Sequence, residues 1–527
     1  MRFPGVKICG AAVLVALVVT GCGAQPAAQT GALAELDASD ADPSGHLRVG
    51  YFLPPRPVDP YTVPSTVAAY PYLTPIYDRL TQIVNGETGA VLAPMVATGW
   101  EFGPDGRSVT FTLRDDVTFS DGTVLDSAAV KASLERAMRL PGSTVSSYYS
   151  MVDGIDAVDP RTVTIRTNRP ASDLPYVLSG VEGMLISPNA VGNADLDVRP
   201  VGSGPYVLDT LRVGDSVSYV RREGYWDPSA QLPERITITG FADGNARMNA
   251  LRSGQIDLAY AMPVDYAQAS NLGRGFGFHS YPPSTAYAVN LNTNAADMAR
   301  PEVRQALNFA IDREGINKSI LHGQCTPNAQ AATPGMIGYL EEPPIRYDYD
   351  PERARQILES AGATNIELEI MAPARVSPVV EIATAVRSQL EDIGIKVNYQ
   401  EIDQAEMNAR FSRGGTYDAT INGRVPRPSS LQSFQYWYRS QQLFPGPRPA
   451  GFDEALDRAF DPTLTADQQT QALEGTAAIA TEQAMNVYIC ATPTQFAYSD
   501  KVIGATEMAM SNVQGVPDLR HVGVAKK

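Results

Sequence analysis

The chain has 527 residues, of which 44% are hydrophobic, and its formal net charge is −16 at pH 7. A chain of this length can form two or more hydrophobic cores, and its composition is too apolar for a wholly disordered protein. The large negative charge would repel a phosphate backbone, so the composition argues against nucleic acid as a partner.

The first 21 residues predict an export signal. Arg2 and Lys7 give a basic start, residues 8–19 are almost wholly apolar, and the tetrapeptide VTGC ends at Cys22. The apolar stretch is shorter than the ~20 residues that cross a bilayer, and small residues precede the expected cleavage point. VTGC resembles a bacterial lipobox, which implies lipidation of Cys22 and anchoring on the extracytoplasmic face of the cell membrane. The alternative is an ordinary signal peptide with a fortuitous cysteine.

The folded body is expected to begin at His46, after a small and polar tether over residues 22–45. LRVGYF predicts a first strand, and alternating apolar residues predict further strands at 109–113 and 163–165. PEVRQALNFAIDR, which starts at Pro301, places its apolar residues on one helical stripe and its proline in the first turn.

Residues 366–400 read as strand, helix and strand, which predicts a βαβ unit with parallel strands. Its first loop, MAPARVSP, carries Arg375 at the carboxyl end of a strand, where open α/β sheets usually bind ligands. YDATING predicts another strand, which runs into the cationic loop that holds Arg424 and Arg427. Two cationic loops are therefore expected to face one crevice.

Several motifs follow one another in a fixed order. They are Trp100, FTLR and FSDG within 92–138, GSGPY at 202–206, YW at 225–226, and the stretches 246–259, 303–316, 349–363 and 487–504. Together they resemble family 5 of the bacterial solute-binding proteins, the oligopeptide, dipeptide and nickel receptors of ABC importers. The resemblance covers residues 46–510, nearly the whole expected mature body.

The resemblance implies an α/β, two-lobe periplasmic-binding-protein-like fold (type II, cluster C). Such a fold has mixed sheets, a hinged interlobe cleft and an extra subdomain in lobe I. Lobe I would take residues 46–288 plus 490–527, with the subdomain at about 77–205, and lobe II would take 289–489. The chain would cross between the lobes near Ala288 to Asn292 and near Val487 to Ala491.

The resemblance also identifies candidate ligand-binding residues. In peptide-binding members of the family, an Asp after the strand that corresponds to YDATING grips the ligand's α-ammonium, and here that place holds Arg427. Arg424 takes the place of the preceding Trp, and Arg375 matches an arginine that holds the ligand carboxylate in dipeptide-binding relatives. The alternatives are that Arg424 and Arg427 pair outward with surface acids, and that Arg375 is a surface arginine.

Aromatic residues follow the cationic loop in SFQYWYRS. Phe434, Tyr436 and Trp437 are candidate pocket walls because aromatic rings pack well on small solutes, although a dense aromatic segment is more often core. By the resemblance, Tyr225 and Trp226 are expected only to pack. Residues 202–206 are expected to form a tight connection with special backbone angles.

No motif indicates catalysis. The four histidines are scattered and there is no HExxH, CxxC, GxSxG or GxxxxGK[ST], so we expect no enzyme, no metal and no cofactor. Cys325 and Cys490 could form a disulfide in an oxidising compartment, or both could stay unpaired.

The sequence therefore predicts a monomeric, lipid-anchored receptor that captures a solute between two lobes and delivers it to an ABC permease with its ATPase subunits. The solute is expected to be a peptide or peptide-like molecule, anionic or N-blocked, because Arg427 would repel a free amine. The alternative is a non-transport envelope protein of the same fold that regulates or carries a glycolipid precursor.

Overall fold

The structure is a computed structural model that describes residues 36–63, 66–86, 89–170, 172–374, 376–412, 417–427, 429–461, 463–510 and 515–526. The expected signal segment, Cys22 and Arg375 lie outside the described residues.

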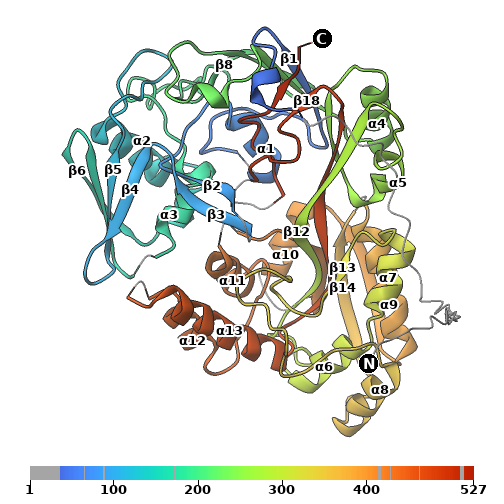
Figure 1. Cartoon of the computed structure of the whole chain (residues 1–527). Helices are drawn as coiled ribbons and strands as arrows, with labels where there is room; N and C mark the ends of the chain where they lie inside the picture. Colours follow the sequence, from blue (N-terminus) through green and yellow to red (C-terminus); the bar gives the residue numbers. More distant parts are fainter. Residues whose placement is uncertain are drawn as a thin grey trace, which may run out of the picture.

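One sheet of eleven strands runs through both halves of the molecule (Figure 1). Its path is β15 (Lys396–Ile402), β14 (Glu367–Pro373), β16 (Ala419–Arg424), β12 (Phe276–Leu291), β17 (Asn486–Ser499), β11 (Leu258–Ala261), β1 (His46–Tyr51), β10 (Arg235–Gly240), β9 (Ser216–Arg221) and β8 (Tyr206–Arg212), and β13 (Thr326–Pro327) pairs with β17 off this path. Strand β14 pairs in parallel with β15 and β16, and β1 pairs in parallel with β10 and β11. The other neighbours along the path pair antiparallel, so the sheet is mixed.

The long strands β12 and β17 join the two halves of the sheet. Residues 276–280 of β12 pair with 495–499 of β17 beside β11, and residues 286–290 pair with 486–491 beside β16. Between these segments the register is irregular, and Pro283 lies opposite Pro493. A proline has no N–H to donate, so the hydrogen-bond ladder is weakest at this point. The lobe boundaries expected from the sequence fall inside these two strands.

Lobe I is the half whose core gathers around β1, β8, β9 and β10. Its smaller sheets are β4 (Ala97–Phe102), β5 (Ser108–Leu113), β7 (Thr162–Thr167) and β6 (Val152–Asp159) in that order, β2 (Thr81–Gly86) with β3 (Gly89–Pro94), and β18 (Val502–Ile503) with β19 (Gly523–Val524). Its helices are η1 (Ala38–Asp40), α1 (Thr66–Leu73), α2 (Ser127–Arg139), η2 (Ser146–Tyr149), α3 (Leu174–Val177), η3 (Val181–Gly183), η4 (Pro228–Ala230), α4 (Gly244–Arg252), η5 (Pro263–Asp265) and α5 (Tyr266–Ala269).

Lobe II is the other half, and it has one core around β14 and β16 and a second core among its last helices. Its helices are α6 (Pro301–Phe309), α7 (Arg313–Ile320), α8 (Pro351–Ser360), α9 (Val379–Asp392), α10 (Gln404–Ser412), α11 (Ser430–Arg439), α12 (Phe452–Ala459) and α13 (Ala466–Glu482). The α/β two-lobe fold expected from the sequence is confirmed.

The βαβ unit is confirmed as β14, α9 and β15, with β14 parallel to both β15 and β16. The helix expected over PEVRQALNFAIDR is shorter than predicted, because α6 ends at Phe309 and a separate helix, α7, begins at Arg313. Asp312 explains the break: its carboxylate accepts from the N–H of Gly315 and caps α7. The predicted apolar stripe is nevertheless buried throughout.

Gly202 and Gly204 form the expected tight connection, but for a different reason than predicted. Neither glycine has a positive φ, so no special backbone angle is required. A Cβ on Gly202 would lie 2.1 Å from the carbonyl oxygen of Ile76, and a Cβ on Gly204 would lie 2.4 Å from its carbonyl carbon. Any side chain at these two positions would therefore clash with the backbone of Ile76, which packs directly against both glycines.

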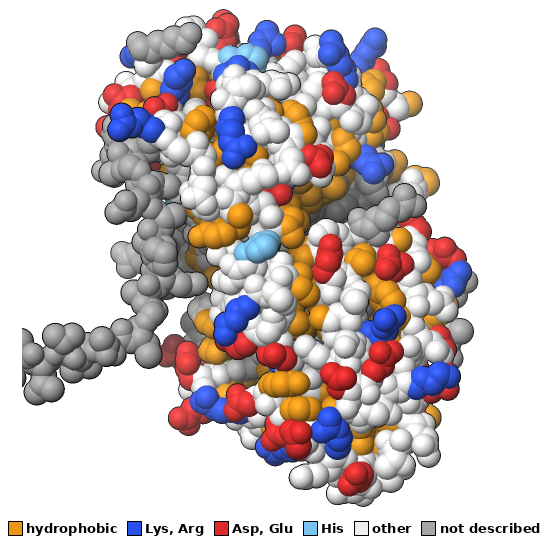
Figure 2. Space-filling model, turned by 90° about the vertical axis from the view of Figure 1, so that its right-hand side faces the viewer, with side chains coloured by type: hydrophobic (Ala, Val, Ile, Leu, Met, Phe, Trp, Pro, Cys, Tyr) orange, Lys and Arg blue, Asp and Glu red, His pale blue; other side chains and the backbone are white. Residues whose placement is uncertain are grey.

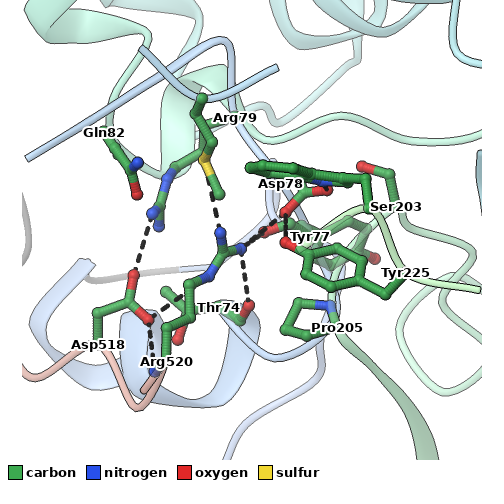
Figure 3. A network of polar contacts seen from close by, with 12 residues as sticks. Thr74, Tyr77, Asp78, Arg79, Gln82, Ser203, Pro205, Tyr225, Asp518 and Arg520 are labelled. Atoms are coloured by element: carbon green, nitrogen blue, oxygen red, sulfur yellow. Dashed lines mark hydrogen bonds and ion pairs between the residues drawn. The ribbon is translucent and has the colours of Figure 1, made fainter. Parts of the chain in front are cut away.

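A buried ion-pair network ties the last residues of the chain into lobe I (Figure 3). The Arg520 guanidinium lies 2.8 Å from Asp78 and 3.7 Å from Asp518, and Asp518 lies 3.0 Å from Arg79. All four side chains are buried. Burial by itself raises the pKa of Asp518, but Arg520 and Arg79 outweigh it and hold the pKa below its usual value.

Tyr225 and Trp226, which the sequence predicts only to pack, complete this network. The Tyr225 hydroxyl and the Trp226 indole N–H each donate to Asp78, at 2.8 Å and 3.1 Å. The network therefore joins three segments that are distant in sequence, residues 78–79, 225–226 and 518–520.

Cys325 and Cys490 are joined by a disulfide, with their Cα atoms 5.7 Å apart. Cys490 lies in β17 and Cys325 directly precedes β13, so the bond fastens β13 to the strand with which it pairs.

We predict that Arg520→Met lowers the stability of lobe I. Removing one partner from a buried ion pair leaves the other charge unpaired and typically costs about 3–5 kcal/mol. Urea unfolding followed by circular dichroism measures the effect. Arg199→Met is the control, because Arg199 is 81% exposed beside Asp195 and its loss should change little. Equal effects of the two substitutions would contradict the role given to the network.

Candidate functional site

The candidate site is the seam between the lobes, which we define by the contacts that cross it. The side-chain amide of Gln432, in α11 of lobe II, donates to the carbonyl and carboxylate oxygens of Asp173 in lobe I, at 3.2 Å and 3.4 Å. The Ser172 hydroxyl donates to the carbonyl of Phe460 at 3.0 Å. Figure 1 places α11 below α3 and β3, and Figure 2 shows hydrophobic side chains along the waist between the halves.

Arg427 reaches across this seam. Its guanidinium lies 3.9 Å from the ring centre of Tyr436 in lobe II and 5.3 Å from the ring centre of Tyr148 in lobe I. Burial by itself would lower its pKa, but Tyr148, Tyr436 and Glu182 outweigh burial, and the pKa is raised. Arg427 therefore remains a cation between two ring faces.

Local structure fixes the backbone of Arg427 at this place. Strand β16 ends at Arg424, and Ser429 caps α11 by accepting from the N–H of Gln432 at 3.1 Å. The Ser433 hydroxyl accepts from the N–H of Arg427 at 2.7 Å and donates to the carbonyl of Ser429 at 2.9 Å. A short connection pinned at both ends thus presents the side chain toward lobe I.

Arg424 points the other way, into lobe II. Its Nε donates to Asn290 at 2.6 Å, one terminal nitrogen donates to the Tyr488 hydroxyl, and the other donates to the carbonyl of Leu443 at 3.2 Å. The side chain is 1% exposed. Its N–H groups donate to residues inside the protein, which gives Arg424 a structural role. The structure therefore supports neither the expected ligand contact in the cleft nor the alternative of an outward pairing with surface acids.

The aromatic residues of α11 fall into two groups, one in the lobe II core and one at the seam. Phe434 and Trp437 are buried in the lobe II core with Tyr438 and Phe444, which favours the alternative that they are core residues. Tyr436 is half-buried and faces Arg427 at the seam. Helical spacing explains the division, because residues two apart lie on different faces of a helix.

The structure also places residues at the seam that the sequence analysis missed. Tyr148, Asp173 and Glu182 come from lobe I, more than 240 positions from Arg427 in the sequence, and no local pattern marks them. Apart from these seam residues, Phe52 and Tyr260 of lobe I pair at the carboxyl ends of β1 and β11, with ring centres 4.8 Å apart. Both rings are half-buried, and the signal that could have found Phe52 is its position directly after the first strand.

The described residues hold no group of three or more His, Cys, Asp or Glu side chains placed to bind a metal ion. Among the same residues, no helix combines the length and hydropathy that a membrane crossing requires.

The seam has a titratable group in Asp173. Burial raises its pKa above the ordinary 3.8, and Arg169 and the hydrogen bond from Gln432 offset only part of the shift. A carboxyl group whose pKa is raised in the folded state binds its proton more tightly there. Its contribution to stability is therefore full below the ordinary pKa and is lost as pH rises through the raised pKa.

We predict that Asp173→Asn stabilises the protein at pH 7.5 and that this gain disappears toward pH 4. Asparagine keeps an oxygen that can accept from Gln432 but removes the buried charge. Urea unfolding of both proteins across this pH range measures the difference. Asp195→Asn, at an exposed position, should give no such trend. A gain for Asp173→Asn that does not depend on pH would contradict the assignment.

The sequence profile of "Bacterial extracellular solute-binding proteins, family 5 Middle" matches residues 91–444. The glutathione-binding protein GsiB of Escherichia coli K12 is 29% identical over 335 residues, which are 63% of this chain and 65% of that protein. The chain thus aligns with slightly less than two thirds of the length of this relative.

Two solved structures illustrate the likeness in fold. AgaA from A. tumefaciens R10, in complex with agropinic acid, has a TM-score of 0.77 at 24% identity and covers 92% of this chain and 99% of its own. DppA from Helicobacter pylori, in complex with the peptide STSA, has a TM-score of 0.77 at 21% identity and covers 92% and 98%. Together with the profile match over most of the folded body, these findings place the chain in family 5 of the bacterial extracellular solute-binding proteins.

Proposed function

We propose that this protein is an extracytoplasmic receptor of an ABC importer, which captures a solute between its lobes and delivers it to a permease. The observation that carries the proposal is the way the lobes are joined. Strands β12 and β17 run through both lobes, their ladder is interrupted at Pro283 and Pro493, and separate contacts close the seam. Such a molecule can bend at the interruption and enclose a solute.

Half-buried aromatic rings in both lobes support a small organic solute. Phe52 and Tyr260 in lobe I and Tyr436 in lobe II offer ring faces, which are efficient walls for such pockets. Arg375 keeps its proposed role as a carboxylate-binding residue on the strength of the sequence resemblance.

We further propose that the solute is peptide-like and anionic or N-blocked. A guanidinium ~4 Å from a free ammonium costs about 4 kcal/mol at an effective dielectric near 20. That is half of the ~8 kcal/mol that holds a micromolar ligand. Arg427 is the residue that imposes this penalty. The related proteins are a glutathione-binding protein (GsiB), a complex with agropinic acid (AgaA) and a complex with a peptide (DppA). Their ligands are consistent with a small peptide-like or acidic solute.

A binding experiment with matched peptides tests this function. The same tetrapeptides are offered with free and acetylated N-termini, together with glutathione, opine acids and phosphorylated sugars, and binding is followed by thermal shift and then calorimetry. A true solute at 100 times its Kd stabilises the folded protein by about 2.7 kcal/mol. We expect acidic or acetylated compounds to bind more tightly than free-amine peptides. A consistent preference for free-amine peptides would contradict the proposed solute class, and no binding at all would count against the receptor.

Lipid anchoring through Cys22 is the remaining part of the proposal, and it is supported by the VTGC tetrapeptide. Cys22→Ser should move the exported protein from the membrane fraction to the soluble fraction. If the substituted protein stayed with the membrane, the anchor would have to be elsewhere.

A further inference from the structure

Arg427 is held by groups from both lobes. Tyr436 comes from α11 of lobe II, whereas Tyr148 comes from η2 of lobe I and Glu182 from η3 of lobe I. Opening the seam would leave the guanidinium with Tyr436 and remove the two lobe I groups. The contact with lobe I therefore exists only while the lobes are closed.

The surroundings of the Arg427 side chain show how strongly it relies on these groups. Its Nε is buried and has no hydrogen-bond partner among the described residues. A buried cation needs compensation, and here charge interactions with Tyr148, Tyr436 and Glu182 and a hydrogen bond with the Tyr436 side chain raise its pKa against the effect of burial. The guanidinium is thus held by the two ring faces, by Tyr436 and by nearby charge.

Arg424, three residues away, is an internal comparison. It is held by groups of lobe II and of the strand ladder, so closing or opening the seam leaves its hydrogen bonds in place. The loop is therefore fixed to lobe II by one arginine and reaches lobe I with the other.

We propose that Arg427 is an interlobe clasp, which holds the cleft closed in the absence of solute and so controls solute entry. The inference rests on the proposed solute-capture function and adds regulation of that site. A ligand that enters through the open form meets only the fraction of molecules that are open. A clasp therefore slows capture and weakens the apparent affinity for every solute, so that only a solute with many contacts to the protein is captured. One cation–π contact and one nearby charge are expected to shift the closed-to-open ratio by about tenfold.

Small-angle scattering of the unliganded protein tests the clasp. Arg427→Ala should increase the radius of gyration, and Tyr148→Ala and Glu182→Gln should do so from the lobe I side. Arg387→Ala is the matched control, because Arg387 lies on α9 of lobe II and pairs with Glu391 of the same helix. Near-ultraviolet circular dichroism identifies any variant that fails to fold.

Chemical rescue separates a clasp from a structural role. Methylguanidinium at millimolar concentration should compact Arg427→Ala, since it can occupy the place between the two tyrosine rings. Potassium chloride at the same ionic strength should not, and methylguanidinium should not compact Arg427→Ala/Tyr148→Ala. An unliganded Arg427→Ala protein that folds and scatters as the wild type does would overturn the clasp, and so would expansion that methylguanidinium leaves unchanged.

These readouts need no solute, so they are independent of the binding experiment. A clasp without binding of any compound would overturn solute capture alone, whereas binding without a change in Arg427→Ala would overturn the clasp alone.

Discussion

The rest of the structure depends on the antiparallel ladder between β12 and β17. Among the described strands, this ladder is the part of the main sheet that both lobes share, because β11 continues the sheet into lobe I and β16 continues it into lobe II. Pro283 opposite Pro493 weakens the ladder between those two segments. The same strands therefore hold the lobes together and allow them to bend.

The two lobes are made rigid by different means. In lobe I, the network around Arg520 fixes the C-terminal residues to the segment before β2 and to Tyr225. In lobe II, the disulfide between Cys325 and Cys490 fastens β13 beside β17. Rigid lobes concentrate any movement at the proline pair, which is a condition for a cleft that closes around a solute.

The fold could be predicted well because local sequence patterns determine most of its helices and strands. Alternation and helical spacing gave β1, β14, α9, β15 and β16 nearly at their observed bounds, and the ordered motifs gave the two-lobe fold. The chief local error was at the end of α6, where the helix stops at Phe309 although the apolar stripe runs on to Ile311. The stripe continues past the end of the helix, so hydrophobic spacing alone could not show where the helix ends.

The site was less predictable because side-chain direction depends on tertiary packing. The sequence placed Arg424 and Arg427 in one cationic loop, but it could not show that one enters lobe II and the other crosses the seam. Their partners, Asn290 for the first and Tyr148 for the second, lie more than 130 positions away. The sequence comparison puts Arg427 where peptide-binding relatives have an Asp. In the structure its guanidinium also contacts side chains of both lobes.

The most direct test of the central claim is the distance between the lobes measured by pulsed electron paramagnetic resonance. Spin labels at Val158→Cys in lobe I and Ile337→Cys in lobe II, with Cys9 and Cys22 replaced by serine, use two exposed positions. A hinged protein should give two distances, and a bound solute should shift the population toward the one that matches the closed arrangement. A single distance that no solute changes would contradict a hinged protein.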